Sequence, residues 1–143
     1  MGHRFLGGFI SLCLAAMPCS GARAADIVPV VSAKSHVRDL NTDQVADIFL
    51  GKTSHFPDGS QALPIDQSEE SPAREKFYAQ FTGKSPAQLR AYWAKIIFTG
   101  RGQPPRQVSG SLEAKKLVAQ NPNAIGYIDA SLVDDTVRVV DGR

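Results

Sequence analysis

The segment from Leu40 to Lys52, LNTDQVADIFLGK, constrains the fold of this chain more than any other part of its sequence. The Asn-Thr pair near its start can cap a helix, and the acidic residues that follow suit the positive end of the helix dipole. Gly51 supplies the left-handed residue that ends many helices. Three apolar residues recur at the i, i+3, i+4 spacing of one buried face, namely Val45, Ile48 and Phe49. The segment therefore predicts a short helix that docks on a core by one stripe.

The rest of the chain reads as short strands and further helices. Pro29 lacks an amide donor, which moves the first strand towards a sheet edge. The order strand, helix, strand, three helices, strand, strand predicts an α/β fold with helices packed on a mixed, mostly parallel sheet. Such sheets bind ligands beyond the carboxyl ends of their strands. The expected strands are 27–31, 62–65, 124–128 and 137–140, the expected helices lie near 42–50, 72–82, 86–99 and 112–120, and 101–106 is a stiff, basic loop.

The helix near 86–99 has the clearest signals of the four. Ser85 and Gln88 stand at the spacing of a capping box, and Gly100 can end the helix. Its broad apolar face places Trp93 in the core. The residues of that face are Leu89, Tyr92, Trp93, Ile96 and Ile97.

Residues 1–24 have the features of a secretory signal: a short basic start, an apolar core and Ala22-Arg23-Ala24 before the cleavage point. The apolar core is well short of the roughly 20 residues that cross a bilayer, which disfavours a membrane anchor. A lipid-modified Cys19 is a further alternative, disfavoured by its Met-Pro neighbours. We therefore expect cleavage before Ala25, a periplasmic protein, and one domain over residues 25–143.

Charge and cysteine content narrow the class of the expected mature protein. Both cysteines, Cys13 and Cys19, lie in the signal, so the rest of the chain carries no disulfide and no thiol chemistry. Of 16 basic residues, Arg4 and Arg23 also fall there, and the remainder equal the 14 acidic residues in number. A formally neutral chain lacks the positive charge that binds phosphate backbones, so we expect no nucleic-acid partner.

Two separated elements carry a resemblance to a known family. The segment LNTDQVADIFLGK resembles the helix of phosphate-type periplasmic substrate-binding proteins, in which a leucine and a polar cap precede a terminal Ile-Phe-x-Gly-Lys. Residues 121–128, NPNAIGYI, resemble the Pro and the Ile-Gly-Tyr strand that follow in the same family. The resemblance extends over roughly 27–128. Members of the family have two lobes that close over phosphate, and this chain has residues for a single periplasmic-binding-protein-like lobe.

The resemblance implies a secreted, non-enzymatic protein linked to the binding or transport of phosphate or another small oxyanion. Its expected partner is a membrane transporter or sensor. In the family, one strand runs into a turn whose amides and hydroxyls hold phosphate at a helix start. The corresponding turn here is 66–74, DQSEESPAR. The candidate ligand-binding residues are therefore Asp66, Gln67, Ser68, Ser71 and Arg74.

Physical chemistry leaves two interpretations of this turn open. A helix start attracts anions, the serines and Arg74 add donors, and Asp66 can accept the proton of a hydrogen phosphate. Glu69 and Glu70 oppose an anion, and the turn lacks glycine. In the second interpretation Ser71 is only a helix cap, and the glutamates only favour the dipole.

Motifs for catalysis, metals and cofactors do not stand out. His36 and His55 lie in expected loops without carboxylates or cysteines at ligand spacing, and no Gly-x-Ser-x-Gly segment occurs. We therefore expect neither an enzyme nor a bound cofactor or metal. The alternative function is a periplasmic interaction or sensory accessory protein that has lost anion binding, which an exposed apolar patch would favour.

Overall fold

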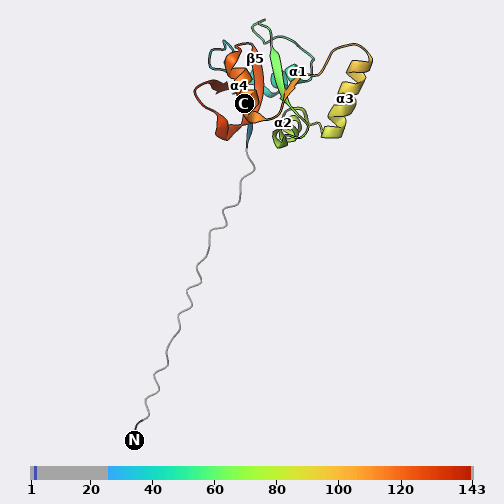
Figure 1. Ribbon diagram of the computed structural model, residues 1–143. Helices are drawn as coiled ribbons and strands as arrows, with labels where there is room; N and C mark the ends of the chain where they lie inside the picture. The colour runs from blue at the N-terminus through green and yellow to red at the C-terminus, as the bar shows by residue number, and fades with distance from the viewer. Residues whose placement is uncertain (1, 3–25, 143) are drawn as a thin grey trace.

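The computed structural model describes Gly2 and residues 26–142, in which helices cover both faces of a central sheet (Figure 1). Apart from Gly2, the expected secretory signal, its cleavage point and both cysteines lie outside the described residues. Within the described part of the chain, no helix is long and apolar enough to span a membrane.

The central sheet has the strand order β4-β3-β5-β1-β6. β3 pairs in parallel with β4 and β5, whereas β1 is antiparallel to β5 and β6, so four of the five strands point one way. The prediction of a mixed, mostly parallel sheet is confirmed. The bounds are β1 Ile27–Ser32, β3 Leu63–Gln67, β4 Arg106–Val108, β5 Ala124–Asp129 and β6 Val137–Val139. β2 (Leu40–Asn41) and β7 (Asp141–Gly142) form a separate parallel pair.

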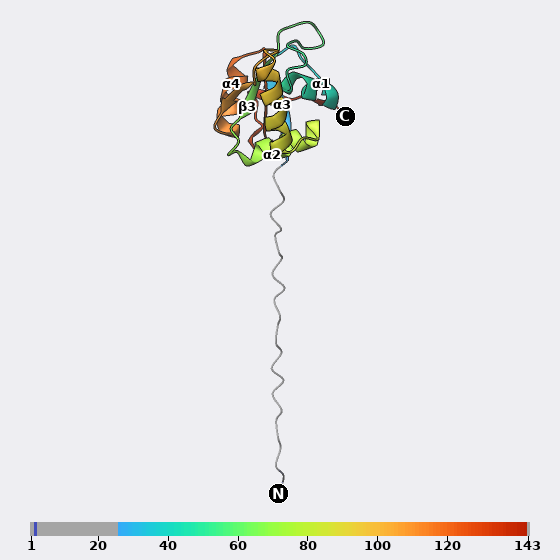
Figure 2. The ribbon, with the colours of Figure 1, turned by 90° about the vertical axis from the view of Figure 1, so that its right-hand side faces the viewer.

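Two apolar cores lie on the two faces of the sheet. The larger core joins β1 and β5 to α1 (Thr42–Phe49), α2 (Pro72–Thr82) and α3 (Pro86–Phe98). The smaller core joins the opposite face to α4 (Ser111–Gln120) and the short 3-10 helix η1 (Ala130–Leu132). Figure 2 shows α4 and α1 on opposite sides of the sheet, and Figure 1 shows α3 standing at one edge of the domain.

Local capping explains where two helices begin. In α1, the Asn41 side chain accepts from the Gln44 amide at 2.8 Å, and the Gln44 side chain accepts from the Asn41 amide at 3.0 Å. Ser85 and Gln88 form the same reciprocal pair at the start of α3. Both capping boxes satisfy amides that the first turn of a helix leaves free.

Glycine explains the packing of both family-like segments. Gly51, with φ of 70°, follows α1, and a Cβ there would lie 3.1 Å from the ring of Trp93. Tyr92 also donates from its hydroxyl to the Leu50 carbonyl at 2.6 Å, so α3 is fastened to the end of α1. In β5, a Cβ on Gly126 would lie 2.9 Å from a methyl of Val118 in α4. Close packing, rather than a ligand, therefore requires both glycines.

The expected apolar face of α3 is only partly confirmed. Trp93 is buried, with 6% of its surface exposed, and Leu89 is buried one turn earlier. The expectation for Ile97 was wrong, because Ile97 is 54% exposed and its neighbour Phe98 is 93% exposed. α3 contacts the body through a narrow stripe of Leu89 and Trp93 with the half-buried Tyr92 and Ile96 beside them, and its last turn extends past that contact.

The expectation that Pro29 marks an edge strand was also wrong. β1 lies between β5 and β6. The Val140 amide donates to the Pro29 carbonyl at 3.0 Å, and the β1–β6 register begins only at Val30. The nitrogen and carbonyl of a strand residue point to the same side of the strand. The missing amide of Pro29 would therefore face Val140, which follows the last residue of β6. The Val140 carbonyl, which an amide at position 29 would face, accepts instead from the Leu40 amide at 3.1 Å, so the proline ends the β1–β6 ladder without leaving this acceptor unpaired.

The expected basic loop over 101–106 ends in a strand. β4 begins at Arg106, which pairs with Ile65 of β3, and its three residues place a parallel neighbour beside the end of β3. β4 is short and mostly exposed, so its sequence shows no alternation of apolar and polar residues.

Candidate functional site

The carboxyl ends of three neighbouring parallel strands, β4, β3 and β5, meet at one edge of the sheet. β3 leads into α2 on one face, and β4 leads into α4 on the other. Adjacent strands whose helices leave to opposite faces create a crevice at their carboxyl ends. A crevice of about 360 Å³ lies here. Its lining residues are Ile27, Glu70, Ser71, Pro72, Ala73, Lys76, Ser109, Gly110, Ser111 and Asp129.

Two helix starts face this crevice without side-chain caps. Ser71 occupies the N-cap position of α2 and Gly110 that of α4, and neither helix has a side-chain acceptor for its first amides. Such amides and the helix dipole together favour a bound anion. Pro72 removes one of these donors from α2.

The charged residues around the crevice are mixed in sign. Lys76 adds one positive charge, whereas Glu70 and Asp129 add negative charge. Hydrogen bonds from the backbone and hydroxyl of Ser131 lower the pKa of Asp129, and nearby Lys76 adds to that effect. Asp129 is therefore an ionised neighbour of any ligand at neutral pH.

A buried polar network centred on Asp66 forms the floor beneath the turn. Asp66 accepts hydrogen bonds from the Tyr127 hydroxyl at 2.5 Å, the Tyr78 hydroxyl at 2.7 Å and the Gln67 amide at 2.7 Å. Burial, followed by the charge of Asp66, raises the pKa of Tyr78 and of Tyr127. Both tyrosines therefore remain hydrogen-bond donors at neutral pH.

Gln67 and Ser71 connect this network to the start of α4. The Gln67 side-chain amide donates to the Tyr127 carbonyl at 2.8 Å and to the Ser111 hydroxyl at 3.2 Å. The Ser71 hydroxyl donates to the Gln67 side-chain oxygen at 2.5 Å. Ser71 is therefore the N-cap residue of α2 by position, as the second interpretation expected, but its side chain makes no capping hydrogen bond.

Arg74 lies on the side of α2 away from the crevice. Its Nε is 3.6 Å from the Asp66 carboxylate, and its guanidinium lies 5.2 Å from the centre of the Tyr78 ring. With Glu69 it lines the gap between α2 and α3. Among the described residues its buried Nε has no hydrogen-bond partner. Its position is that of a counter-charge for Asp66.

The structure thus divides the five candidate ligand-binding residues. Asp66, Gln67 and Arg74 are buried in the network, and Ser71 alone of the five also lines the crevice. Ser68 is half-buried and contributes its backbone, whose amide donates to Val108 at 2.8 Å. That these residues bind a ligand stays a prediction.

Sequence reasoning missed most of the crevice. The helix near 112–120 was predicted, but Ser109-Gly110-Ser111 before it was not recognised as a second helix start at the sheet edge, because the strand that precedes it was not predicted. Lys76, Asp129 and Tyr127 gave no local signal, because tertiary folding alone brings them to the turn. In the described part of the chain, no group of three or more His, Cys, Asp or Glu side chains is placed to hold a metal.

A doubly covered sheet with a crevice at its carboxyl edge is characteristic of α/β domains that bind ligands at a topological switch point. No protein-family model matches the chain. A Clostridium perfringens protein described as a phosphate ABC transporter substrate-binding protein, solved with bound phosphate, is 27% identical with a TM-score of 0.63. The match covers 81% of this chain and 44% of that protein.

Two further solved structures have the same fold at lower identity. An ABC-type phosphate transport receptor from Vibrio cholerae is 17% identical with a TM-score of 0.61, covering 81% of this chain and 45% of its own. PstS from Borrelia burgdorferi is 11% identical with a TM-score of 0.61, covering 82% and 47%. The chain thus spans less than half of each structure. Its resemblance to phosphate ABC transporter substrate-binding proteins is confirmed, and a partial, single-lobe form fits.

Proposed function

We propose that this chain is an exported, non-enzymatic protein that binds phosphate weakly in the crevice between α2 and α4. The observation that carries the proposal is the convergence of two helix starts without side-chain caps on the carboxyl ends of three parallel strands. Anions are stabilised at such helix starts. The phosphate bound to the similar Clostridium perfringens protein supports the same class of ligand.

In this proposal the crevice and the network have different roles. Free amides of both helices, the hydroxyl of Ser111 and the ammonium of Lys76 donate to the anion, whereas the hydroxyl of Ser71 stays with Gln67. Asp66, Gln67, Arg74 and the backbone of Ser68 hold the turn from below. A membrane transporter or sensor is the proposed partner.

The affinity follows from charge and exposure. Glu70 and Asp129 repel an anion, and one lobe leaves a face of the ligand in water. We expect a dissociation constant on the order of 1 mM, which corresponds to a favourable binding free energy of about 4 kcal/mol.

Titration calorimetry and amide chemical shifts with inorganic phosphate test the proposal. Lys76→Gln should weaken binding about threefold, as expected for one exposed charge, whereas Lys116→Gln, an exposed change on α4 outside the crevice, should not. Absence of heat and of shift changes at about 10 mM phosphate, roughly ten times the expected dissociation constant, would contradict the proposal.

One observation favours the interaction protein as a second candidate. Ile97 and Phe98 expose apolar surface at the free end of α3, which stands at the edge of the domain (Figure 1). Exposed apolar patches mark interaction sites. Sedimentation of the wild type against Phe98→Ser tests this candidate, with Leu112→Ser on α4 as the matched control because Leu112 is also exposed. Equal sedimentation of all three as monomers over a wide concentration range would remove self-association as the interaction.

A further inference from the structure

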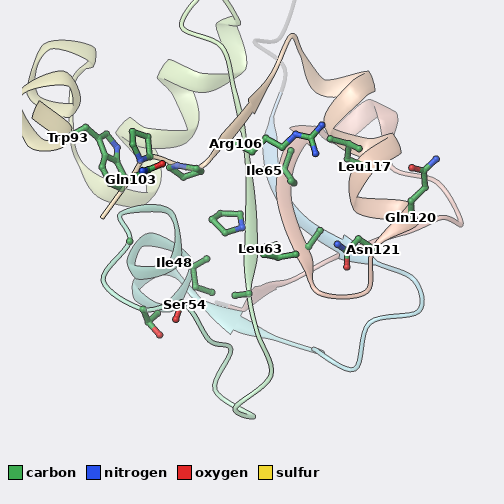
Figure 3. Close-up of a pocket in the computed structure, with 17 residues that line it drawn as sticks. Ile48, Ser54, Leu63, Ile65, Trp93, Gln103, Arg106, Leu117, Gln120 and Asn121 are labelled. Carbon is green, nitrogen blue, oxygen red and sulfur yellow. The ribbon is translucent and has the colours of Figure 1, made fainter. Parts of the chain in front are cut away.

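A second and larger cleft opens at the other end of the same strands. It has a volume of about 690 Å³ and lies at the amino ends of β3, β4 and β5, opposite the crevice. Figure 3 shows Trp93 and Gln103 on one side, Leu117 on the other, and Leu63 and Ile65 of β3 between them. Its size is that of a site for a small organic molecule.

The walls are suited to an apolar body. Proline rings at positions 64, 104 and 105 face the cleft together with Trp93 and Leu117. Because proline has no backbone amide, burying this part of the wall under an apolar ligand leaves no amide donor of these residues without a partner. Trp93 is buried, and its Nε1 has no hydrogen-bond partner among the described residues.

Charge selects the head group of the ligand. Of the described residues that line the cleft, Arg106 alone is charged, and no carboxylate is among them. The carboxyl end of α1 also reaches the cleft, and the free carbonyls of a helix end disfavour an anion. One of these carbonyls, that of Leu50, is already paired with the Tyr92 hydroxyl. The exposed Arg106 side chain in Figure 3 extends beside Ile65 towards Leu117. An anionic head can therefore reach the guanidinium while the body lies against apolar residues.

We propose that this cleft binds an apolar carboxylate, with the hydrocarbon body between Trp93 and Leu117 and the carboxylate at Arg106. This site is separate from the phosphate crevice and does not depend on it. Trp93 is the only tryptophan in the chain, so its emission reports directly on the cleft.

The test is a tryptophan-fluorescence titration with decanoate below its micelle concentration, with decan-1-ol as the uncharged match. We expect a saturable change in emission for both, with decanoate bound about threefold more tightly, the effect of one exposed ion pair. Arg106→Gln should remove that preference and leave decan-1-ol unchanged. Arg101→Gln, an exposed arginine outside the cleft lining, should change neither.

Two residues on one helix provide the second comparison. Leu117→Asp should weaken both ligands about tenfold or more, because it replaces apolar contact by a hydrated carboxylate, which also repels the head group of decanoate. Leu112→Asp, outside the cleft lining on the same helix, should leave binding unchanged.

Amide shift mapping on the wild type needs no variant and should locate decanoate at the cleft residues. Shifts elsewhere, equal binding by the two leucine variants, or equal affinity of decanoate and decan-1-ol in the wild type would overturn the proposal. Phosphate titration of the same variants should remain at the wild-type value.

Discussion

The two ends of the parallel strands differ in size, chemistry and support. At the carboxyl end, two helix starts and mixed charges surround a crevice of about 360 Å³ over a buried polar network. At the amino end, a cleft of about 690 Å³ is lined by more apolar than polar residues, and proline, leucine, isoleucine and tryptophan are its large apolar side chains. The sheet therefore separates hydrogen bonding from apolar contact, and one short domain presents two surfaces with different ligand preferences.

The comparison also shows how each end is held. The crevice depends on side chains that are far apart in sequence and meet at Asp66, whereas the cleft depends on α3, which is fastened by Trp93 and Tyr92 to the end of α1. Substitutions can therefore weaken one end and leave the other intact.

Trp93→Ala should have the largest effect on stability, because it removes the main contact of α3 and one wall of the cleft. We expect a loss of about 3 to 5 kcal/mol in the free energy of unfolding, measured by urea denaturation. The exposed Phe98→Ala in the same helix is the control and should change stability by less than about 0.5 kcal/mol. Similar losses for both variants would contradict the packing described for α3.

Arg74→Met should destabilise the carboxyl end by removing the counter-charge of Asp66. We expect about 2 to 3 kcal/mol, less than for a fully broken buried ion pair, because Asp66 keeps its three hydrogen bonds. Arg90→Met, an exposed neighbour in the α2–α3 gap, should be close to neutral. If instead Arg74→Met abolished phosphate binding at unchanged stability, Arg74 would be a direct ligand of the anion.

Stability should fall above pH 10 because of the two buried tyrosines. The pKa of Tyr78 and of Tyr127 is raised from an ordinary 10.0 in the folded state, so the unfolded chain loses these protons first. Their contribution is complete below pH 10 and is lost as the pH rises further, by about 1.4 kcal/mol per pH unit for each tyrosine. Unfolding followed by tyrosinate absorbance checks this. In Tyr78→Phe, the free energy of unfolding should fall less steeply with pH, because unfolding releases one tyrosine proton fewer.

The smallest expected effect in this comparison is a difference in phosphate affinity between variants of two adjacent glutamates. Glu70 lines the crevice, whereas Glu69 lines the gap between α2 and α3. Glu70→Gln should strengthen phosphate binding about fivefold, and Glu69→Gln by less than about twofold, at low salt. Added salt should reduce the difference. Equal effects in calorimetric titrations would place the anion outside the crevice.

The predictable parts of the fold were those with local causes. The starts of α1 and α3 were readable because Asn41 with Gln44, and Ser85 with Gln88, satisfy their own helix ends. β4 was missed because its three residues gain their strand conformation from pairing with β3. A local pattern cannot show such a long-range pairing.

The candidate site was predictable in position more than in role. The turn at 66–74 does lie at the carboxyl edge of the sheet, beside a crevice. The inward direction of Asp66 depends on Tyr127, which is 61 residues away in the sequence. Glu70 lines the crevice together with the start of α4, which lies far from it in the sequence. Residue type alone carries neither fact.

The place of β1 in the sheet sets the order in which this domain can be completed. β1 is the first strand of the described chain, and its two neighbours, β5 and β6, are formed by segments that begin at Ala124 and Val137. Until those segments have been synthesised, Val30 and Val31 have no strand partner, and both stay exposed to solvent or to other chains. Such late, non-local pairing slows folding and prolongs the risk of aggregation. A nascent chain of this protein therefore needs protection along its first strand until nearly all of the described sequence has left the ribosome.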